Sequence, residues 1–237
     1  MRPLPLFHDR QDAGLQLAAA LRQRLHKDDV VVLALPRGGV PVGEEIAREL
    51  NAPLDVLFVR KLGAPGYPEL GVGAVVDGEH PQRILNQRVL DAVQPPPGYL
   101  EAEERRQLEV IEQRRRLFRH DRPPEPVEGR TAIVVDDGIA TGGTVRVALQ
   151  ALARSGAARL MLAVPVAPRE VLPQLPVAPE NSVCLYALPD FVAVGAYYRN
   201  FEQLDDDTVI ALLDRAHRRL YGASGAPRGA SPGRPAV

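Results

Sequence analysis

The sequence predicts an α/β protein with a largely parallel sheet flanked by helices. Two observations carry this prediction: short continuous apolar runs rich in β-branched residues, and stretches of helical period that alternate with them. Continuous apolar runs are typical of strands buried on both faces, as in parallel sheets. Alternating strands and helices favour crossover connections within one sheet. A length of 237 residues fits a single large domain.

The first half of the chain begins with a predicted helix over 9–25, where leucines recur among alanines and Asp9 or Asp12 can cap the first turn. The next elements are predicted to be strands at Val30–Leu35, Leu54–Val59 and Val72–Asp77, with a helix at Val40–Leu50. The stretch Arg60–Gly73 is rich in glycine and proline and is predicted to be a loop that moves. Residues 78–98 show no clear pattern.

The second half opens with a strong predicted helix at Tyr99–Arg119, whose acids come first and whose bases come last, as the helix dipole favours. Its basic cluster at 114–119 fits either a solvent-exposed helix face or a polyanion-binding surface. Strands are then predicted at 131–135, 159–166 and 182–188, and helices at 144–155, 168–175 and 205–221. We interpret 1–221 as one domain with a helical insertion at about 78–127, followed by a disordered low-complexity tail at 222–237.

The composition excludes several classes of protein. The 29 Lys and Arg residues nearly balance the 30 Asp and Glu residues, so no global field attracts nucleic acid or an anionic membrane. The single cysteine, Cys184, excludes an internal disulfide framework. We expect no membrane-spanning helix, because no run of about 18 apolar residues exists, and a cytoplasmic location, because the amino end has no long apolar stretch.

The most informative segment is Ala132–Thr144, AIVVDDGIATGGT, in which a buried strand leads through two acids and a Thr-Gly-Gly-Thr turn into a helix. The first N–H groups of a helix lack internal partners and carry partial positive charge. Gly142 and Gly143 let the backbone approach an anion closely, and Thr141 and Thr144 add hydroxyl donors. These parts make a cradle for a monophosphate.

Two acids, Asp136 and Asp137, precede this cradle and would repel a bare anion. A sugar phosphate resolves the conflict, because its hydroxyls can donate to the carboxylates while its phosphate lies on the amides. The combination indicates a ribose phosphate. The alternative is a capped turn in which Asp137 closes a local side-chain bond.

This segment resembles the motif with which type I phosphoribosyltransferases bind phosphoribosyl pyrophosphate (PRPP). The resemblance implies the fold of that family and a C-terminal hood over about 188–204. It also implies that Asp136 and Asp137 contact the ribose hydroxyls and, indirectly, Mg²⁺. The 5-phosphate would be held by Ala140, Thr141, Gly142, Gly143 and Thr144.

The turn at 36–39, Pro-Arg-Gly-Gly, follows the first predicted strand and resembles the pyrophosphate loop of the family. It is close to the form in bacterial xanthine–guanine enzymes, and such loops often contain a non-proline cis peptide. Two adjacent cations, Arg60 and Lys61, lie at the end of the next predicted strand. The resemblance implies pyrophosphate contacts from Arg37, Gly38, Gly39, Arg60 and Lys61. Glu69, in a stretch similar to adenine phosphoribosyltransferases, is a candidate acid or base; the alternative is an exposed loop carboxylate.

The segment Leu188–Phe201, LPDFVAVGAYYRNF, carries four of the eleven aromatic residues. It resembles the hood of hypoxanthine–guanine enzymes, in which Phe191 or Val192 would cover the base; the alternative is ordinary packing of aromatic side chains. Ala140 replaces the acid that those enzymes place near the base, and Asn200 replaces an acid near the metal. The acceptor therefore stays open.

Taken together, these motifs predict an enzyme of nucleotide metabolism and nucleoside salvage that uses PRPP and Mg²⁺ to transfer 5-phosphoribosyl to a nitrogen acceptor, a nucleobase-like molecule, with release of pyrophosphate. We expect a homodimer. The alternative is a non-catalytic regulatory protein that senses PRPP and whose basic cluster at 114–119 contacts nucleic acid.

Overall fold

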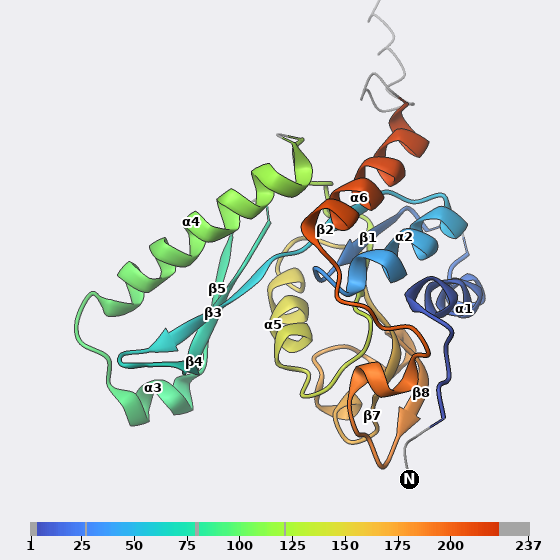
Figure 1. Ribbon diagram of the computed structural model, residues 1–237. Coiled ribbons are helices and arrows are strands. Elements are labelled where there is room, and N and C mark those ends of the chain that lie inside the picture. The colour runs from blue at the N-terminus through green and yellow to red at the C-terminus, as the bar shows by residue number, and fades with distance from the viewer. Residues whose placement is uncertain (1–3, 27, 79–80, 121, 223–237) are drawn as a thin grey trace, which may run out of the picture.

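A five-stranded parallel sheet forms the centre of the computed structural model, which describes residues 4–26, 28–78, 81–120 and 122–222 (Figure 1). The strand order is β2-β1-β6-β7-β8, and all neighbouring pairs are parallel. The strands are β1 (Val30–Ala34), β2 (Leu54–Val56), β6 (Thr131–Val135), β7 (Arg159–Pro168) and β8 (Ser182–Leu188). The predicted fold class is confirmed.

Helices cover both faces of this sheet. Helices α1 (Arg10–Arg22), α2 (Gly39–Leu50) and α6 (Asp206–Tyr221) pack on one face, and α5 (Gly143–Leu152) packs on the other (Figure 1). Side chains of β1 alternate between the two layers: Val30 and Val32 join the first, and Val31 and Leu33 join the second. This is why the strand is a continuous apolar run.

Two aspartates begin helices of the first layer. The Asp9 carboxylate accepts from the Asp12 backbone N–H at 2.9 Å, and the Asp205 carboxylate accepts from the Thr208 N–H at 2.8 Å. Both acids satisfy amides that have no partner within the helix. Of the two predicted caps for the first helix, Asp9 is the one observed.

Residues 59–119 form a second unit, which we call the arm. It contains an antiparallel sheet of order β3-β4-β5 and two helices, and it projects beside α5 (Figure 1). Its elements are β3 (Val59–Ala64), β4 (Tyr67–Val76), β5 (Gln82–Leu85), α3 (Gln87–Val93) and α4 (Tyr99–Arg119). The helix predicted at Tyr99–Arg119 is observed with the same bounds. The arm begins before the insertion expected at 78–127, because β3 and β4 belong to it.

The prediction of a loop at Arg60–Gly73 was wrong, because most of this stretch is the β3–β4 hairpin. Its glycines mark close approach of two strands: a Cβ on Gly63 would lie 2.8 Å from Pro68 Cα, where the register shifts. Gly66 makes the turn with φ of +73°. The single strand predicted at Leu54–Val59 was also wrong, since β2 ends at Val56 and the chain passes into the arm.

The basic cluster of α4 faces the protein more than the solvent. The side chain of Arg119 is 7% exposed; its guanidinium donates to Asp55 at 2.7 Å and lies 3.1 Å from the carboxylate of the fully buried Asp77 side chain. Arg115 also pairs with Asp77. The expectation of a solvent-exposed basic face was therefore wrong for these side chains, although Arg116 is 71% exposed.

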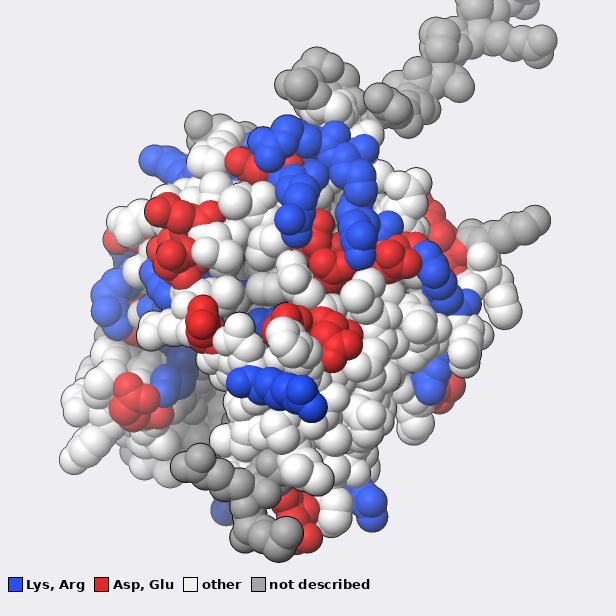
Figure 2. Space-filling model, turned by 45° about the vertical axis from the view of Figure 1, so that its right-hand side comes forward, with Lys and Arg blue, Asp and Glu red and all other residues white. Residues whose placement is uncertain are grey.

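Three short 3-10 turns complete the described chain: η1 (Leu172–Gln174), η2 (Pro179–Asn181) and η3 (Val194–Tyr197). The helix predicted over 168–175 is reduced to η1, because β7 continues to Pro168. The tail predicted at 222–237 lies outside the described residues except for Gly222. On the face shown in Figure 2, acidic and basic side chains are interspersed. Among the described residues, no helix is both long and apolar enough to cross a bilayer.

Candidate functional site

The loop between β6 and α5 lies at the carboxyl edge of the parallel sheet, where open α/β sheets bind ligands. β6 ends at Val135, and Asp136 and Asp137 follow directly. Helix α5 begins at Gly143, and no side chain in the described part of the chain caps its amino end. Its first amides are therefore available to an anion.

The Thr-Gly-Gly-Thr turn presents its polar groups outward. Thr141, Gly143 and Thr144 are exposed, while Gly142 is buried with φ of +76°. A Cβ on Gly142 would lie 2.7 Å from a methyl group of Val171, so both the positive φ and the lack of space require glycine at this position. The turn expected to hold a phosphate is thus an exposed start of α5 without a side-chain cap in the described part of the chain.

The Pro-Arg-Gly-Gly turn lies against this loop, because β1 and β6 are neighbouring parallel strands. A Cβ on Gly38 would overlap Oδ2 of Asp137, and a Cβ on Gly39 would lie 2.6 Å from the Val135 carbonyl oxygen. The peptide bond between Pro36 and Arg37 is cis, the trait that the resemblance associates with this loop. The two glycines therefore let the two turns meet.

Arg10, from α1, is a member of the site that the sequence reasoning missed. Its Nε lies 2.8 Å from Oδ2 of Asp137, and the two side chains are only 11% and 14% exposed. The guanidinium also lies 3.8 Å from the ring centroid of Phe201 and donates to the Glu202 carbonyl oxygen at 2.9 Å. Arg10 thereby joins Asp137 to the segment before α6. No local pattern identifies it, since the contact spans 127 residues.

Burial controls the electrostatics of the two acids. It raises the pKa of Asp136, and the neighbouring charge of Asp137 raises it further. Burial also raises the pKa of Asp137, although its hydrogen bond and ion pair with Arg10 oppose that shift. The backbone carbonyl of Asp137 accepts from the hydroxyl of Tyr198 at 2.6 Å. Arg10 is thus the cation that favours the ionised form of Asp137.

A cleft of about 1090 Å³ separates the arm from α5 and brings together groups from both predicted anion sites. It is lined by Arg60, Lys61 and Glu69 from the arm and by Thr141, Gly143 and Thr144 from the phosphate loop. Lys61 Nζ lies 3.0 Å from a carboxylate oxygen of Glu69, whose side chain is 97% exposed. Arg60 Nε donates to Gln107 at 3.1 Å. The structure therefore brings these arm residues to the same cleft as the phosphate loop.

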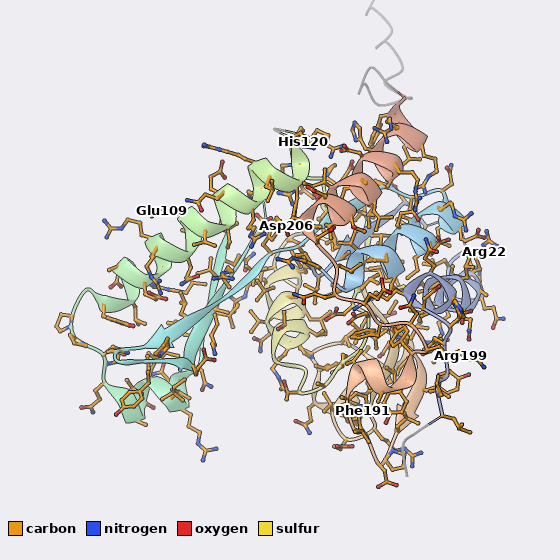
Figure 3. The ribbon with its side chains drawn as sticks, viewed as in Figure 1. Arg22, Glu109, His120, Phe191, Arg199 and Asp206 are labelled. Atoms are coloured by element: carbon orange, nitrogen blue, oxygen red, sulfur yellow. The ribbon has the colours of Figure 1, made fainter. Side chains whose placement is uncertain are left out.

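A second hollow of about 500 Å³ is lined by Arg10, Arg37, Gly38 and Asp137, together with residues 201–204. The two hood residues proposed to cover a base do not line this hollow or the cleft. The ring centroids of Phe191, labelled in Figure 3, and Tyr197 are 5.3 Å apart, and Val192 is 68% exposed. In the hood it is the last four residues, 201–204, that reach the hollow.

The chemistry of the acids fits magnesium bound through a substrate. The described residues contain no group of three or more His, Cys, Asp or Glu side chains that could hold a metal ion. Mg²⁺ usually keeps several waters and is bound by one or two carboxylates plus substrate phosphates. Asp136 and Asp137, at the edge of the sheet beside the phosphate loop, are suited to such an indirect site.

The parallel sheet with this loop arrangement is the type I phosphoribosyltransferase fold. Residues 9–173 match the family described as "Phosphoribosyl transferase domain", and the chain belongs to that family.

Among its relatives, "Putative phosphoribosyl transferase MT0597" of Mycobacterium tuberculosis (strain CDC 1551 / Oshkosh) is 47% identical over 229 residues, which are 97% of this chain and 51% of the relative. "Putative phosphoribosyl transferase Rv0571c" of M. tuberculosis (strain ATCC 25618 / H37Rv) matches with the same values. The chain spans about half the length of these curated relatives. The solved structure of TT1426 from Thermus thermophilus is 43% identical with a TM-score of 0.75, and the match covers 87% of this chain and 97% of that one.

Proposed function

We propose that this protein transfers the 5-phosphoribosyl group of PRPP to a nitrogen acceptor of the nucleobase type and releases pyrophosphate. The observation that carries the proposal is the contact between the two turns: the Gly38 backbone packs on Asp137, beside the open start of α5. A ribose phosphate that carries a second anionic group needs all three parts close together: the phosphate cradle, the two carboxylates and the cationic turn.

The proposed roles follow the position of each group. Asp136 and Asp137 accept from the ribose hydroxyls, and the amides and hydroxyls of residues 140–144 hold the 5-phosphate. The pyrophosphate contacts would come from Arg37, Gly38, Gly39, Arg60 and Lys61. Phe191 and Val192 remain the proposed cover for the base. Both lie outside the cleft and the second hollow, so a base that they cover would extend past the part of the hood that lines the hollow, residues 201–204.

The reaction forms a bond from the acceptor nitrogen to C1 of the ribose and breaks the bond from C1 to the pyrophosphate oxygen. The electron pair of the broken bond leaves with pyrophosphate, and the acceptor nitrogen loses its proton. Glu69 is the candidate base, and its exposed carboxylate at the mouth of the cleft is paired with Lys61. Mg²⁺, when bound with PRPP, would neutralise charge on the leaving group. The residues of this chain act chiefly by positioning and charge stabilisation.

Calorimetry with Mg-PRPP tests the proposal. Wild type should bind, and the double variant Asp136→Asn with Asp137→Asn should show no binding. Asp91→Asn, which changes an exposed acid on α3, is the matched control and should bind as wild type does. Equal binding by the double variant would refute the site assignment.

A panel of nucleobases with Mg-PRPP, followed by pyrophosphate release, then identifies the acceptor. The rival function is a PRPP sensor, for which the expected result is intact PRPP binding without turnover, together with salt-dependent nucleic-acid binding. Fewer basic side chains of the 114–119 cluster are available for nucleic acid than the sequence suggested, since Arg115 and Arg119 are paired with carboxylates. Sedimentation equilibrium tests the proposed homodimer.

A further inference from the structure

Three arginines from separate segments line one small cavity of about 170 Å³. Arg37 comes from the turn after β1, Arg60 from β3 and Arg114 from α4, and Thr144 at the start of α5 lines the same cavity. Arg37 and Arg60 are in the proposed pyrophosphate site. Arg114 belongs to the basic cluster of α4, to which the family motif assigns no role. Apart from Thr144 the other lining residues are apolar, so the three arginines are the charged residues through which this cavity can bind an anion.

Asp206, the first residue of α6, forms ion pairs with two of these arginines. Its Oδ1 lies 2.9 Å from Nε of Arg37, and its Oδ2 lies 2.8 Å from Nη1 of Arg114. The Arg37 and Arg114 side chains are each 39% exposed and that of Asp206 is 29% exposed, so the arginines are open to solvent, although Oδ1 of Asp206 is itself buried. Figure 3 shows Asp206 at the start of α6, on the side that faces α4.

Asp206 Oδ2 accepts a hydrogen bond from Arg114, whereas Oδ1 lies close to Arg37 but is buried without a hydrogen-bond partner in the described part of the chain, so the carboxylate is only partly satisfied between the two arginines. The arrangement also leaves the cluster unbalanced: Arg37, Arg60 and Arg114 supply three positive charges, and Asp206 supplies one negative charge. A diphosphate group in the cavity would find cations on several sides. Asp206 does not line the cavity itself, but it pairs with two of the arginines that do.

We propose that Arg114 is a further pyrophosphate-binding residue and that Asp206 is an internal counter-ion which competes with pyrophosphate for Arg37 and Arg114. This inference rests on the proposed function. Asp206 holds the two arginines in place when the cavity is empty, and pyrophosphate oxygens replace its carboxylate as their partner. The arm and the core thereby contribute to one anion site, because Arg114 and Arg60 belong to the arm and Arg37 to the core.

The proposal predicts opposite effects from the two partners of one ion pair. Asp206→Asn removes the competing charge and should tighten pyrophosphate binding by about tenfold, a normal size for the coupling between two binding events. Arg114→Gln removes a cation and should weaken binding by about tenfold or more. An ion pair with only a structural role would lose affinity, or show no change, whichever partner was altered.

The experiment is calorimetry of the full chain with inorganic pyrophosphate and, separately, with Mg-PRPP. Two matched controls are Asp207→Asn, an exposed acid in the same first turn of α6, and Arg116→Gln, an exposed arginine on α4. Both should bind within about twofold of wild type. Thermal melting identifies any variant that fails to fold, and Arg114→Lys, which keeps the charge but loses the fork, then replaces Arg114→Gln and should bind with intermediate affinity.

Tighter binding by Asp206→Asn together with weaker binding by the Arg114 variant supports the inference. Unchanged or weaker binding by Asp206→Asn overturns it, as does unchanged binding by the Arg114 variant. If wild type binds PRPP while the variants behave like their controls, only this inference fails. If wild type binds neither PRPP nor pyrophosphate, the proposed function fails as well.

Discussion

Arg10→Met should destabilise the protein strongly, because Asp137 would be left nearly buried without its cation. The Arg10 and Asp137 side chains are 11% and 14% exposed, and their atoms are 2.8 Å apart. Removing one partner of such a pair costs about 3–5 kcal/mol of unfolding free energy. The stack of Arg10 on Phe201, at 3.8 Å, favours the upper part of that range. For a chain of this size each kcal/mol shifts Tm by about 2–4 °C, so the melting temperature should fall by about 6–20 °C.

The assay is urea unfolding beside a matched control in the same helix. Arg22→Met removes an arginine that is 55% exposed and paired with Glu49 at 2.9 Å, and it should cost at most about 1 kcal/mol. In the background Asp137→Asn, Arg10→Met should cost less by about 1–3 kcal/mol, since no buried charge is stranded. A loss for Arg10→Met no greater than that for Arg22→Met would refute the reasoning, as would the absence of coupling to Asp137.

Three further predictions concern single positions. Gly38→Ala, whose methyl group would overlap Oδ2 of Asp137, should weaken PRPP binding at least about tenfold in calorimetry; unchanged affinity would show that the two turns need not touch. Burial raises the pKa of Glu125, so its ionisation costs stability as the pH rises above the ordinary glutamate range. Glu125→Gln, which keeps an acceptor for Tyr221, should therefore need more urea to unfold than wild type at about pH 8 and the same urea at about pH 4; a difference that does not vary with pH would contradict this. Arg119→Met leaves the buried Asp55 carboxylate of the core without its cation, while Asp77 keeps Arg115, and it should cost about 3–5 kcal/mol by scanning calorimetry; a cost below about 1 kcal/mol would mean that the pair between the arm and the core is unimportant.

The elements that the sequence predicted well are those decided by local pattern. β1 was recognisable because both of its faces are buried, and α4 because its charges follow the helix dipole. The β3–β4 hairpin was missed because its glycines and prolines look the same whether they form a loop or a bulged pair of strands. Only the position of the neighbouring strand, at Gly63 against Pro68, separates the two cases.

The same division applies to the candidate site. The two turns could each be found from a short string of residues, and the structure brings them together at one sheet edge because their strands are neighbours. Arg10 could not be found, because its contact with Asp137 depends on how α1 packs on the sheet. The pairing of Arg114 with Asp206 spans 92 residues and likewise has no local signature.

The number of charged residues in a sequence segment also does not give the charge that a ligand contacts in the folded protein. The basic cluster of α4 looks like a free cationic surface in the sequence, yet three of its arginines pair with acids outside the helix: Arg114 with Asp206, Arg115 with Asp77 and Arg119 with Asp55. Where such a pair is buried, as with Arg119, the charge stabilises the fold and is not accessible to a ligand. Where it is partly exposed beside a cavity, as with Arg114, the carboxylate can be exchanged for another anion. Anion binding at this site is then an exchange of counter-ions, and its affinity depends on Asp206 as much as on the arginines.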